Sequence, residues 1–413
     1  METENQSRRT IWIFATASFL NDTGHYLITV IWPIFLTSVL GASTTFLGLV
    51  DGLGDSLASI SQAVSGVISD RTKKRKIFIW IGYLGAALGR VIYFFSQTPW
   101  QFIPGKILDR GGKMRDAPRD AIVADIKKHG SRATAFGALR AADRIGAFAG
   151  LMASMVLIGY FTYRQLFLIA AIPSFIGSLL IVFLIRDTRD GAGRRTVSLS
   201  LKSAGRDLRL LTIASLIFTL GAFSDSFYIL AAKSGGFSVE LVTLLYAVFL
   251  ITAALSAIPF GKLADKKNRR VVIMISYFFF MITNFFFIAF NSFIGLLFAF
   301  LFYGLFYGAY RGNIKTLVAD LSPRDVRASL IGTFGMLTGL VALPASLIAG
   351  FLWQAVDLKA PFVLAVFLSL ISLLVISLVR EGEEQRAENE NGGGRDRRRH
   401  AVETNGVEHE ELQ

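Results

Sequence analysis

GVISDRTKKR, at residues 66–75, returns in altered form as GKLADKKNRR at residues 261–270. The two stretches lie 195 residues apart, and each places a glycine four residues before an aspartate that a basic run follows. Three other matches keep this offset: residues 123–125 with 318–320, residues 132–137 with 327–332, and Gly41 with Gly236. Agreement at separate places along the chain indicates an internal duplication. The sequence therefore predicts two homologous halves.

The composition is typical of a membrane protein. Of the 413 residues, 53% are hydrophobic and 36 are Phe, while only 18% are charged, against roughly 25% in soluble domains. The chain has no cysteine, which excludes disulfides and thiolate ligands, and its four histidines are scattered. We therefore expect no metal site and no cofactor.

Apolar runs of about 20 residues, long enough to cross a bilayer as helices, occur twelve times. They lie near residues 10–32, 45–69, 77–96, 100–121, 134–159, 165–185, 210–232, 239–261, 271–290, 293–315, 328–353 and 361–379. We predict an all-α membrane protein with twelve transmembrane helices in two homologous six-helix bundles. Its parts are an N-terminal half (1–185), a polar cytoplasmic linker (186–209), a C-terminal half (210–380) and a disordered cytoplasmic tail (381–413).

The positive charges indicate how the chain lies in the membrane. The formal net charge is +13, and most basic loop residues fall on one side if the N-terminus is cytosolic. The positive-inside rule then places both termini in the cytosol, with the first span as an uncleaved anchor in the plasma, or inner, membrane. Orientation and lipid headgroup contact explain this charge better than nucleic-acid binding does. We expect a monomer whose partners are the bilayer, a small-molecule substrate and, if transport is coupled to them, protons.

The loop between the second and third span of each half has the pattern G-x-x-x-D-R/K-x-x-R/K-R/K. This pattern resembles the signature loop of the major facilitator superfamily, and the resemblance covers residues 10–380. It implies a fold of two six-helix bundles and a loop that holds the halves together in the outward-facing state. By resemblance, this gating role falls to Gly66, Asp70 and Arg71 and to their repeats Gly261, Asp265 and Lys266. A tight turn with a basic membrane anchor is the simpler alternative.

The stretch GKILDRGGKMRDAPRD, at residues 105–120, contains eight charged side chains. Its repeat at residues 300–315, FLFYGLFYGAYRGNIK, is plainly a membrane helix, so the charged stretch should be the fourth span. On a helical wheel, six of the charges fall within about 120°: Lys106, Asp109, Arg110, Lys113, Asp116 and Asp120. We expect them to neutralise one another at spacings of three and four residues. They should face inward, because one charge at bilayer depth costs about 3 kcal/mol. Arg115 and Arg119 should instead snorkel toward the cytosolic end.

Further charged residues lie within the predicted spans. Span one has Asp22 and His25, span two Asp51 and Asp55, span five Arg140, Asp143 and Arg144, span seven Asp225, and span ten Arg311 and Lys315. Spans six, nine and twelve have none, and span three has only Arg90. This distribution agrees with the superfamily that the chain resembles, in which spans one, four, seven and ten line a central path.

Fourteen of these residues are candidate substrate or proton sites. They are Asp22, His25, Asp51, Asp55, Lys106, Asp109, Arg110, Lys113, Asp116, Arg140, Asp143, Arg144, Asp225 and Arg311. A structural lattice of ion pairs is an equal alternative for seven of them: Asp22, Asp51, Asp55, Lys106, Asp109, Arg110 and Lys113. For His25 a satisfied polar residue is favoured over a proton carrier. For Asp225 we favour a functional role, because no basic neighbour in its own helix neutralises it.

Nothing in the sequence supports an enzyme or an ATP-driven pump, because it has no Walker-type loop, Ser/His/Asp constellation or metal-ligand spacing. We expect a secondary active transporter whose halves rock about a midplane site. The mixture of basic and acidic groups suggests a polar solute, anionic or zwitterionic, with the basic groups of span four holding its negative part. Asp22, Asp51, Asp55 or Asp225 could couple transport to protons.

Two alternatives belong to other classes. One is a proton-driven exporter of amphiphilic compounds, for which the 36 Phe could form an adaptable apolar cavity. The exporter-type G-x-x-x-G-P sequence is incomplete in span five, however, since no proline follows Gly146 and Gly150. The other is a membrane sensor or assembly factor that transports nothing.

Span four departs from the superfamily's R-x-x-Q-G-x-G pattern. It resembles instead a prokaryotic permease branch whose substrates the motif does not disclose.

Overall fold

The fold is known from a computed structural model that describes residues 2–126, 132–185, 204–323 and 326–380. Most of the predicted linker 186–209 and all of the predicted tail 381–413 lie outside these residues. Helix α9 begins at Arg206, so the end of the predicted linker is helical. Every regular element within the described ranges is a helix.

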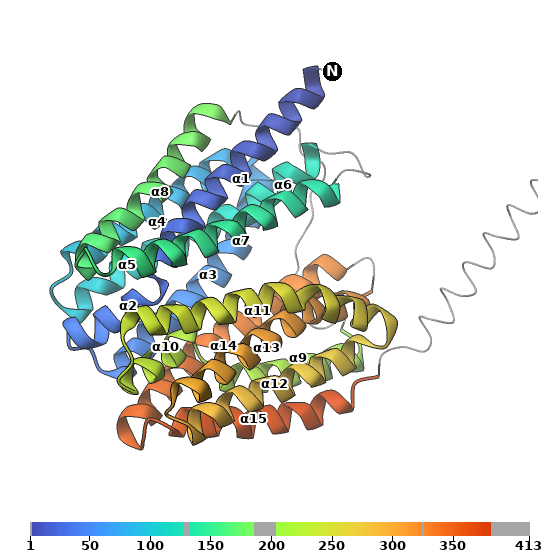
Figure 1. The fold of residues 1–413 in the computed structure, drawn as a ribbon. Helices are drawn as coiled ribbons and strands as arrows, with labels where there is room; N and C mark the ends of the chain where they lie inside the picture. The colour runs from blue at the N-terminus through green and yellow to red at the C-terminus, as the bar shows by residue number, and fades with distance from the viewer. Residues whose placement is uncertain (1, 127–131, 186–203, 324–325, 381–413) are drawn as a thin grey trace, which may run out of the picture.

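The chain forms two bundles of six membrane spans, which confirms the predicted fold class (Figure 1). The first bundle contains α1 (Glu2–Thr29), α2 (Ile31–Ile34), η1 (Phe35–Val39), α3 (Thr44–Thr72), α4 (Arg75–Phe95), α5 (Pro99–Gly111), η2 (Gly112–Arg115), α6 (Asp116–Ile126), α7 (Arg132–Leu157) and α8 (Tyr163–Leu184). The second contains α9 (Arg206–Gly221), α10 (Asp225–Ser234), α11 (Val239–Lys266), α12 (Arg269–Ala289), α13 (Phe293–Asp320), α14 (Arg327–Ala355) and α15 (Ala360–Ser377).

Eight helical spans in the described residues are long and apolar enough to cross a membrane on those criteria alone. They are all six spans of the second bundle together with α4 and α8. The other four spans, formed by α1 to η1, by α3, by α5 to α6 and by α7, belong to the first bundle and carry most of the intramembrane charge. A charged span is stable in lipid only when its charges face protein or water, so these helices must be arranged around a polar interior.

The duplication is visible in the backbone. Gly41 and Gly236 adopt φ values of 70° and 88°, a left-handed region that glycine enters without steric cost. Two residues later, Ser43 and Ser238 cap α3 and α11 by accepting hydrogen bonds from Phe46 N (3.1 Å) and from the backbone N–H of the third helical residue (3.3 Å). The offset of 195 residues therefore relates local geometry as well as sequence.

Three spans that the sequence predicted as continuous helices are interrupted. The first span stops at Thr29 and continues through α2 and the wider turns of η1, and the seventh stops at Gly221 and restarts at Asp225. These two breaks lie at equivalent positions of the repeat, and α2 contacts α10. The fourth span contains the tighter 3₁₀ turn η2 between α5 and α6. Such interruptions free backbone groups and are tolerated at membrane depth where protein or water surrounds them.

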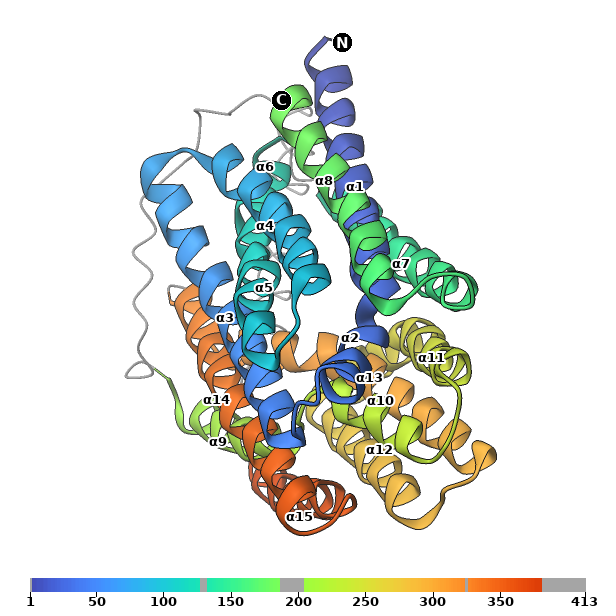
Figure 2. The same cartoon turned by 90° about the vertical axis from the view of Figure 1, so that its left-hand side faces the viewer.

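The two bundles meet along α3 and α14, which lie side by side in Figure 2. Thr44 Oγ1 donates to Gly350 O at 3.0 Å and Ser56 Oγ donates to Gly339 O at 2.8 Å. A Cβ at Gly48 would strike the backbone oxygen of Ser346, so this approach needs glycine. Small residues spaced three and four apart allow such close packing of membrane helices.

This contact occupies only one end of the molecule. Both described ends of the chain lie at one face, which we call the terminal face; the other is the opposite face (Figure 1). The residues that join α3 and α14 extend from the opposite face to about the middle of these helices, where Ser56 meets Gly339. Toward the terminal face, a Cβ at Gly332 or Gly335 of α14 would meet nothing within 4 Å in the described part of the chain. The bundles are therefore closed at the opposite face and diverge toward the terminal face.

Candidate functional site

The charges of α5 are neutralised by neighbouring helices. Lys106 pairs with Asp51 at 3.0 Å, Arg110 pairs with Asp55, and Asp109 lies 3.7 Å from Arg90 of α4. The predicted pairing within the helix is therefore wrong for these three residues. Their partners on α3 and α4 lie closer than the next charge on α5. The packing of the helices decides these pairings, and the sequence of one helix does not contain that information.

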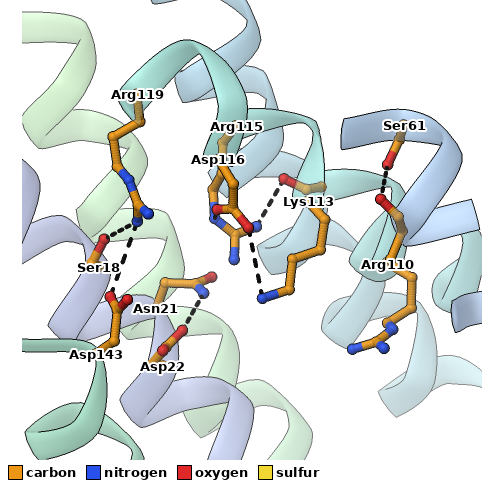
Figure 3. A network of polar contacts seen from close by, with 12 residues as sticks. Ser18, Asn21, Asp22, Ser61, Arg110, Lys113, Arg115, Asp116, Arg119 and Asp143 are labelled. Carbon is orange, nitrogen blue, oxygen red and sulfur yellow. Dashed lines mark hydrogen bonds and ion pairs between the residues drawn. The ribbon is translucent and has the colours of Figure 1, made fainter. Parts of the chain in front are cut away.

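The wheel also assumed one uninterrupted helix, whereas η2 separates α5 from α6. One predicted pair within the span does form, between Lys113 and Asp116 at 3.9 Å (Figure 3).

Lys106 and Asp51 form a buried pair, each with only 6% of its side chain exposed. Lys106 Nζ also lies 3.3 Å from the centre of the Trp32 ring, a cation–π contact. The second carboxylate oxygen of Asp51 accepts a hydrogen bond from Ser224 Oγ at 2.6 Å. Ser224 precedes α10 and accepts from Ser226 N at 3.3 Å, so Asp51 connects the first bundle to the break in the seventh span.

Arg115 and Arg119 do not snorkel to the surface, because each is only 4% exposed. Arg115 donates to Gly112 O at 2.8 Å and lies 4.9 Å from the Tyr83 ring. Arg119 donates to Ser18 Oγ at 2.7 Å, as Figure 3 shows. A hydroxyl on α1, a carbonyl of η2 and an aromatic ring of α4 hold these guanidinium groups inside the bundle, which makes extension to the surface unnecessary.

Asp22, His25 and Asp143 lie around this network. Asp22 accepts from Asn21 Nδ2 at 3.1 Å, and Asp143 lies 4.0 Å from Arg119 (Figure 3). His25 packs against Tyr26 edge to face, with ring centres 5.3 Å apart. The geometry brings Asp22 into electrostatic range of Lys113 and leaves His25 in an aromatic contact.

Asp225 is the first residue of α10 and accepts hydrogen bonds from two hydroxyls. Tyr246 OH donates to one oxygen at 3.1 Å, and Tyr303 OH donates to the other. Within the described ranges, no lysine or arginine forms an ion pair with Asp225. The sequence indicated the lone carboxylate but not the tyrosines, because tyrosine in an apolar helix has no spacing that marks it as a partner.

A second group of cations is poorly neutralised. Arg140 is 68% exposed, and its ion pairs with described residues are long, at 3.9 Å to Asp120 and 3.7 Å to Asp143. The side chains of Arg144 and Lys315 are exposed and form no hydrogen bond or ion pair with any residue that the structure describes. Arg311 is also exposed, donates to Tyr307 OH, and lies 4.9 Å from that ring. Lys315 was not among the predicted site residues.

The two signature loops form equivalent ion clusters, each within one bundle. Arg75 pairs with Asp70 at 2.9 Å and with Asp125, while Arg269 pairs with Asp265 at 2.9 Å and with Asp320 at 2.5 Å. The aspartates keep the offset of 195, but the arginines are 194 residues apart. The first loop contains one additional residue, Lys73, whose φ of 57° places it in the left-handed region.

Helices approach closely at Gly66, where a Cβ would lie 3.3 Å from Ala117. At Gly261 the same atom would meet no described atom within 4 Å. Arg71 and Lys266 are exposed at the terminal face. Because the bundles diverge at this face, the gating role of Gly66, Asp70, Arg71, Gly261, Asp265 and Lys266 stays a prediction.

Comparison with known proteins gives a consistent family. The sequence model described as Major Facilitator Superfamily matches residues 14–238 and 210–407. An uncharacterized MFS-type transporter of Methanocaldococcus jannaschii is 34% identical over 387 residues, covering 92% of this chain and 96% of that protein. The multidrug resistance protein MdtG of Salmonella paratyphi C is 25% identical over 287 residues, covering 65% of this chain and 70% of its own.

Solved structures agree on the fold. The nucleoside transporter NupG superposes with a TM-score of 0.73 at 15% identity, covering 89% of this chain and 97% of that one. A bacterial homolog of the human lysosomal transporter Spinster, in an inward-facing and occupied conformation, gives 0.72 at 14% identity, covering 90% and 96%. At such identities the likeness concerns the fold alone.

Proposed function

This chain belongs to the Major Facilitator Superfamily, a family of multi-pass membrane transporters, and we propose that it moves a small polar solute by secondary active transport. The observation that carries this proposal is the asymmetry of the bundle contact. The halves are packed together at the opposite face and apart at the terminal face, with charged residues from both bundles between them. Rocking of the two bundles about such a contact would expose a central site to each side in turn.

The basic loops support a cytosolic terminal face. Arg71, Lys73 and Lys74 lie there in the first bundle, and Lys266 and Lys267 in the second. By the positive-inside rule, the chain then has both termini in the cytosol, and the conformation described is open to the cytosol. We place it in the plasma membrane as a monomer.

Two carboxylates, Asp51 and Asp225, support protons as the coupling ion. Asp51 receives Lys106 and Ser224 on its two oxygens, so its protonation would weaken a link between the bundles. Among the described residues, the hydrogen-bond partners of Asp225 are tyrosine hydroxyls, so its protonation would break no ion pair within that part of the chain. Neutralising either group thus changes the contacts around the two interrupted spans.

Purified protein in proteoliposomes tests the proposal. A pH gradient should drive uptake or release of a radiolabelled solute, and counterflow should continue without the gradient. Transport at the same rate with and without the pH gradient would contradict proton coupling. The absence of any flux would favour the sensor or assembly-factor alternative.

An exporter of amphiphilic compounds is the second candidate, supported by the likeness to the multidrug resistance protein MdtG. Cells that lack this protein should then be hypersensitive to a broad panel of toxic amphiphiles. A normal response to that panel favours a dedicated carrier of polar solutes.

A further inference from the structure

Four cations from two helices face one region between the bundles. Arg140 and Arg144 are four residues apart on α7, and Arg311 and Lys315 are four residues apart on α13, so each pair lies on one side of its helix. Lys315 interacts electrostatically with Arg140 and with Arg311. Arg144 and Arg311 both interact with Tyr26 of α1. These interactions place the four side chains, which we call the basic tetrad, around a common space.

Nearby acids balance the basic tetrad only in part. Asp120 and Asp143 lie near Arg140, and Asp120 also interacts with Lys315, but both carboxylates face the buried Arg119 as well, at 3.0 Å and 4.0 Å. Asp22 interacts with Tyr26, as Arg144 and Arg311 do, but forms no ion pair with a described member of the tetrad. Asp225 interacts with Arg311 over a longer range but forms no ion pair with it. By contrast, the cations of α5 that the sequence favoured for binding each have a carboxylate of their own.

Like charges held together cost folding energy, since two of them at 4 Å repel by about 4 kcal/mol near a protein surface. The basic tetrad therefore fits a binding site for a negatively charged ligand better than it fits a structural lattice of ion pairs.

The tetrad also has a positioned member. Arg311 donates to Tyr307 OH one turn earlier on α13 and stacks beside its ring at 4.9 Å. A guanidinium fixed in this way loses less side-chain entropy when it binds an oxyanion, and its planar donors suit carboxylate and phosphate.

We propose that Arg140, Arg144, Arg311 and Lys315 bind a small solute with at least two negative charges, of the organic phosphate or dicarboxylate class. The proposal rests on the transport function proposed above and names its cargo site. It moves the negative part of the cargo from span four, where the sequence placed it, to α7 and α13. A monoanion would leave most of the tetrad unbalanced, and a cation would be repelled.

The site also links cargo to conformation. Closing the terminal face brings α7 and α13 together, and with them the four positive charges. An empty site therefore opposes closure, whereas a bound dianion removes the repulsion and adds contacts to both bundles. Ligands shift a conformational equilibrium by this kind of differential affinity.

The same oxyanion chemistry could come from a lipid headgroup that enters from the terminal face. The test therefore uses full-length protein in nanodiscs of phosphatidylcholine alone, and a second set that also contains phosphatidylglycerol. Inorganic phosphate, succinate, acetate and glucose are titrated separately, and binding is followed by thermal shift and calorimetry. The variants are Arg144→Gln and Arg311→Gln, and the matched control is Lys359→Gln, which removes one exposed positive charge at the opposite face.

Phosphate and succinate should bind more tightly than acetate and glucose, with an affinity that falls as salt rises. Each tetrad variant should weaken this binding about tenfold, because one charge-assisted hydrogen bond is lost, while Lys359→Gln should not. If the natural source is lipid, phosphatidylglycerol should compete with phosphate, and this competition should disappear in both variants. Equal binding of all four probes, wild-type binding by both variants, or no anion binding in either disc overturns the proposal.

Cross-linking separates this failure from failure of the transport function. A cysteine pair at Thr45 and Gln354, whose side chains are hydrogen-bonded at 2.7 Å, reports closure of the opposite face without any substrate. If phosphate and succinate bind nowhere but the pair still alternates between closed and open, the anion site is wrong and alternating access stands. If the cysteine pair cross-links fully under every condition, both the anion site and alternating access are wrong.

Discussion

Adding a single methyl group at Gly48 should shift the protein away from the conformation described here. The new Cβ would meet the backbone oxygen of Ser346, with the carbonyl carbon of that residue at 2.8 Å and Leu347 Cα at 3.2 Å. These are backbone atoms, so no side chain can rotate away and α14 itself must move from α3. Overpacking of this kind typically costs about 1–3 kcal/mol.

That cost falls on one state only. When the opposite face opens, α3 and α14 separate at this level and the methyl group meets nothing. The ratio of closed to open molecules should therefore fall by about 5- to 150-fold. The chain has no native cysteine, so Thr45→Cys with Gln354→Cys gives a clean reporter, and the initial rate of cross-linking by a short bis-maleimide follows the closed population.

Gly335→Ala is the matched control, because it adds the same methyl group to α14 where nothing described lies within 4 Å. Gly48→Ala should slow cross-linking and Gly335→Ala should leave it unchanged. A folded Gly48→Ala protein that cross-links at the wild-type rate, or an equal slowing by Gly335→Ala, would refute the assignment of α3 and α14 as the contact that closes this face.

Three further predictions concern single charges. Asp51→Asn should lower the free energy of unfolding by about 3–5 kcal/mol, because it leaves Lys106 charged and buried, and Lys106→Met in the same chain should restore most of the loss. Thermal unfolding in detergent measures both effects. A double variant as unstable as Asp51→Asn alone would contradict the pairing. Asp225→Asn should abolish transport driven by a pH gradient while counterflow continues, and loss of both would mean that this carboxylate is needed for more than coupling. Arg90→Met removes hydrogen bonds to Ala170 O at 2.7 Å and to Ser174 Oγ at 2.5 Å. It should lower the free energy of unfolding by about 3 kcal/mol or more but leave transport per folded molecule intact. A loss of transport without a loss of stability would give α4 a role beyond that of a scaffold.

Much of the fold could be predicted from the sequence because its signals are local. The length of an apolar run sets where a span begins and ends, and most observed helices lie within a few residues of the predicted spans, although α1 already begins at Glu2. The repeat then allowed the charged residues 105–120 to be recognised as a span from the apolar residues 300–315. Gly41 and Gly236 show why this worked, since the same backbone turn recurs at the same offset.

The ion pairs could not be predicted in the same way. A helical wheel gives the direction of a side chain from one helix axis, but the partner of Lys106 lies 55 residues away on α3. The 3₁₀ turn at η2 also changes the direction of every later residue in the span. Arg140, Arg144 and Arg311 were predicted as site residues, but Lys315 and the grouping of the four into the basic tetrad were not. Their shared property is the lack of close carboxylate partners, and this is apparent only when the neighbours are known.

Arg311 and Lys315 occupy the repeat positions of Asp116 and Asp120, so the duplication has given the two halves opposite charges at equivalent places. Lys315 interacts with Asp120 across the molecule. A protein built from two first halves would place Asp120 within range of its own copy, and one built from two second halves would do the same with Lys315. An ancestral pair of identical halves could not have held this arrangement. Produced today as separate polypeptides, the halves should therefore assemble with one another rather than with copies of themselves.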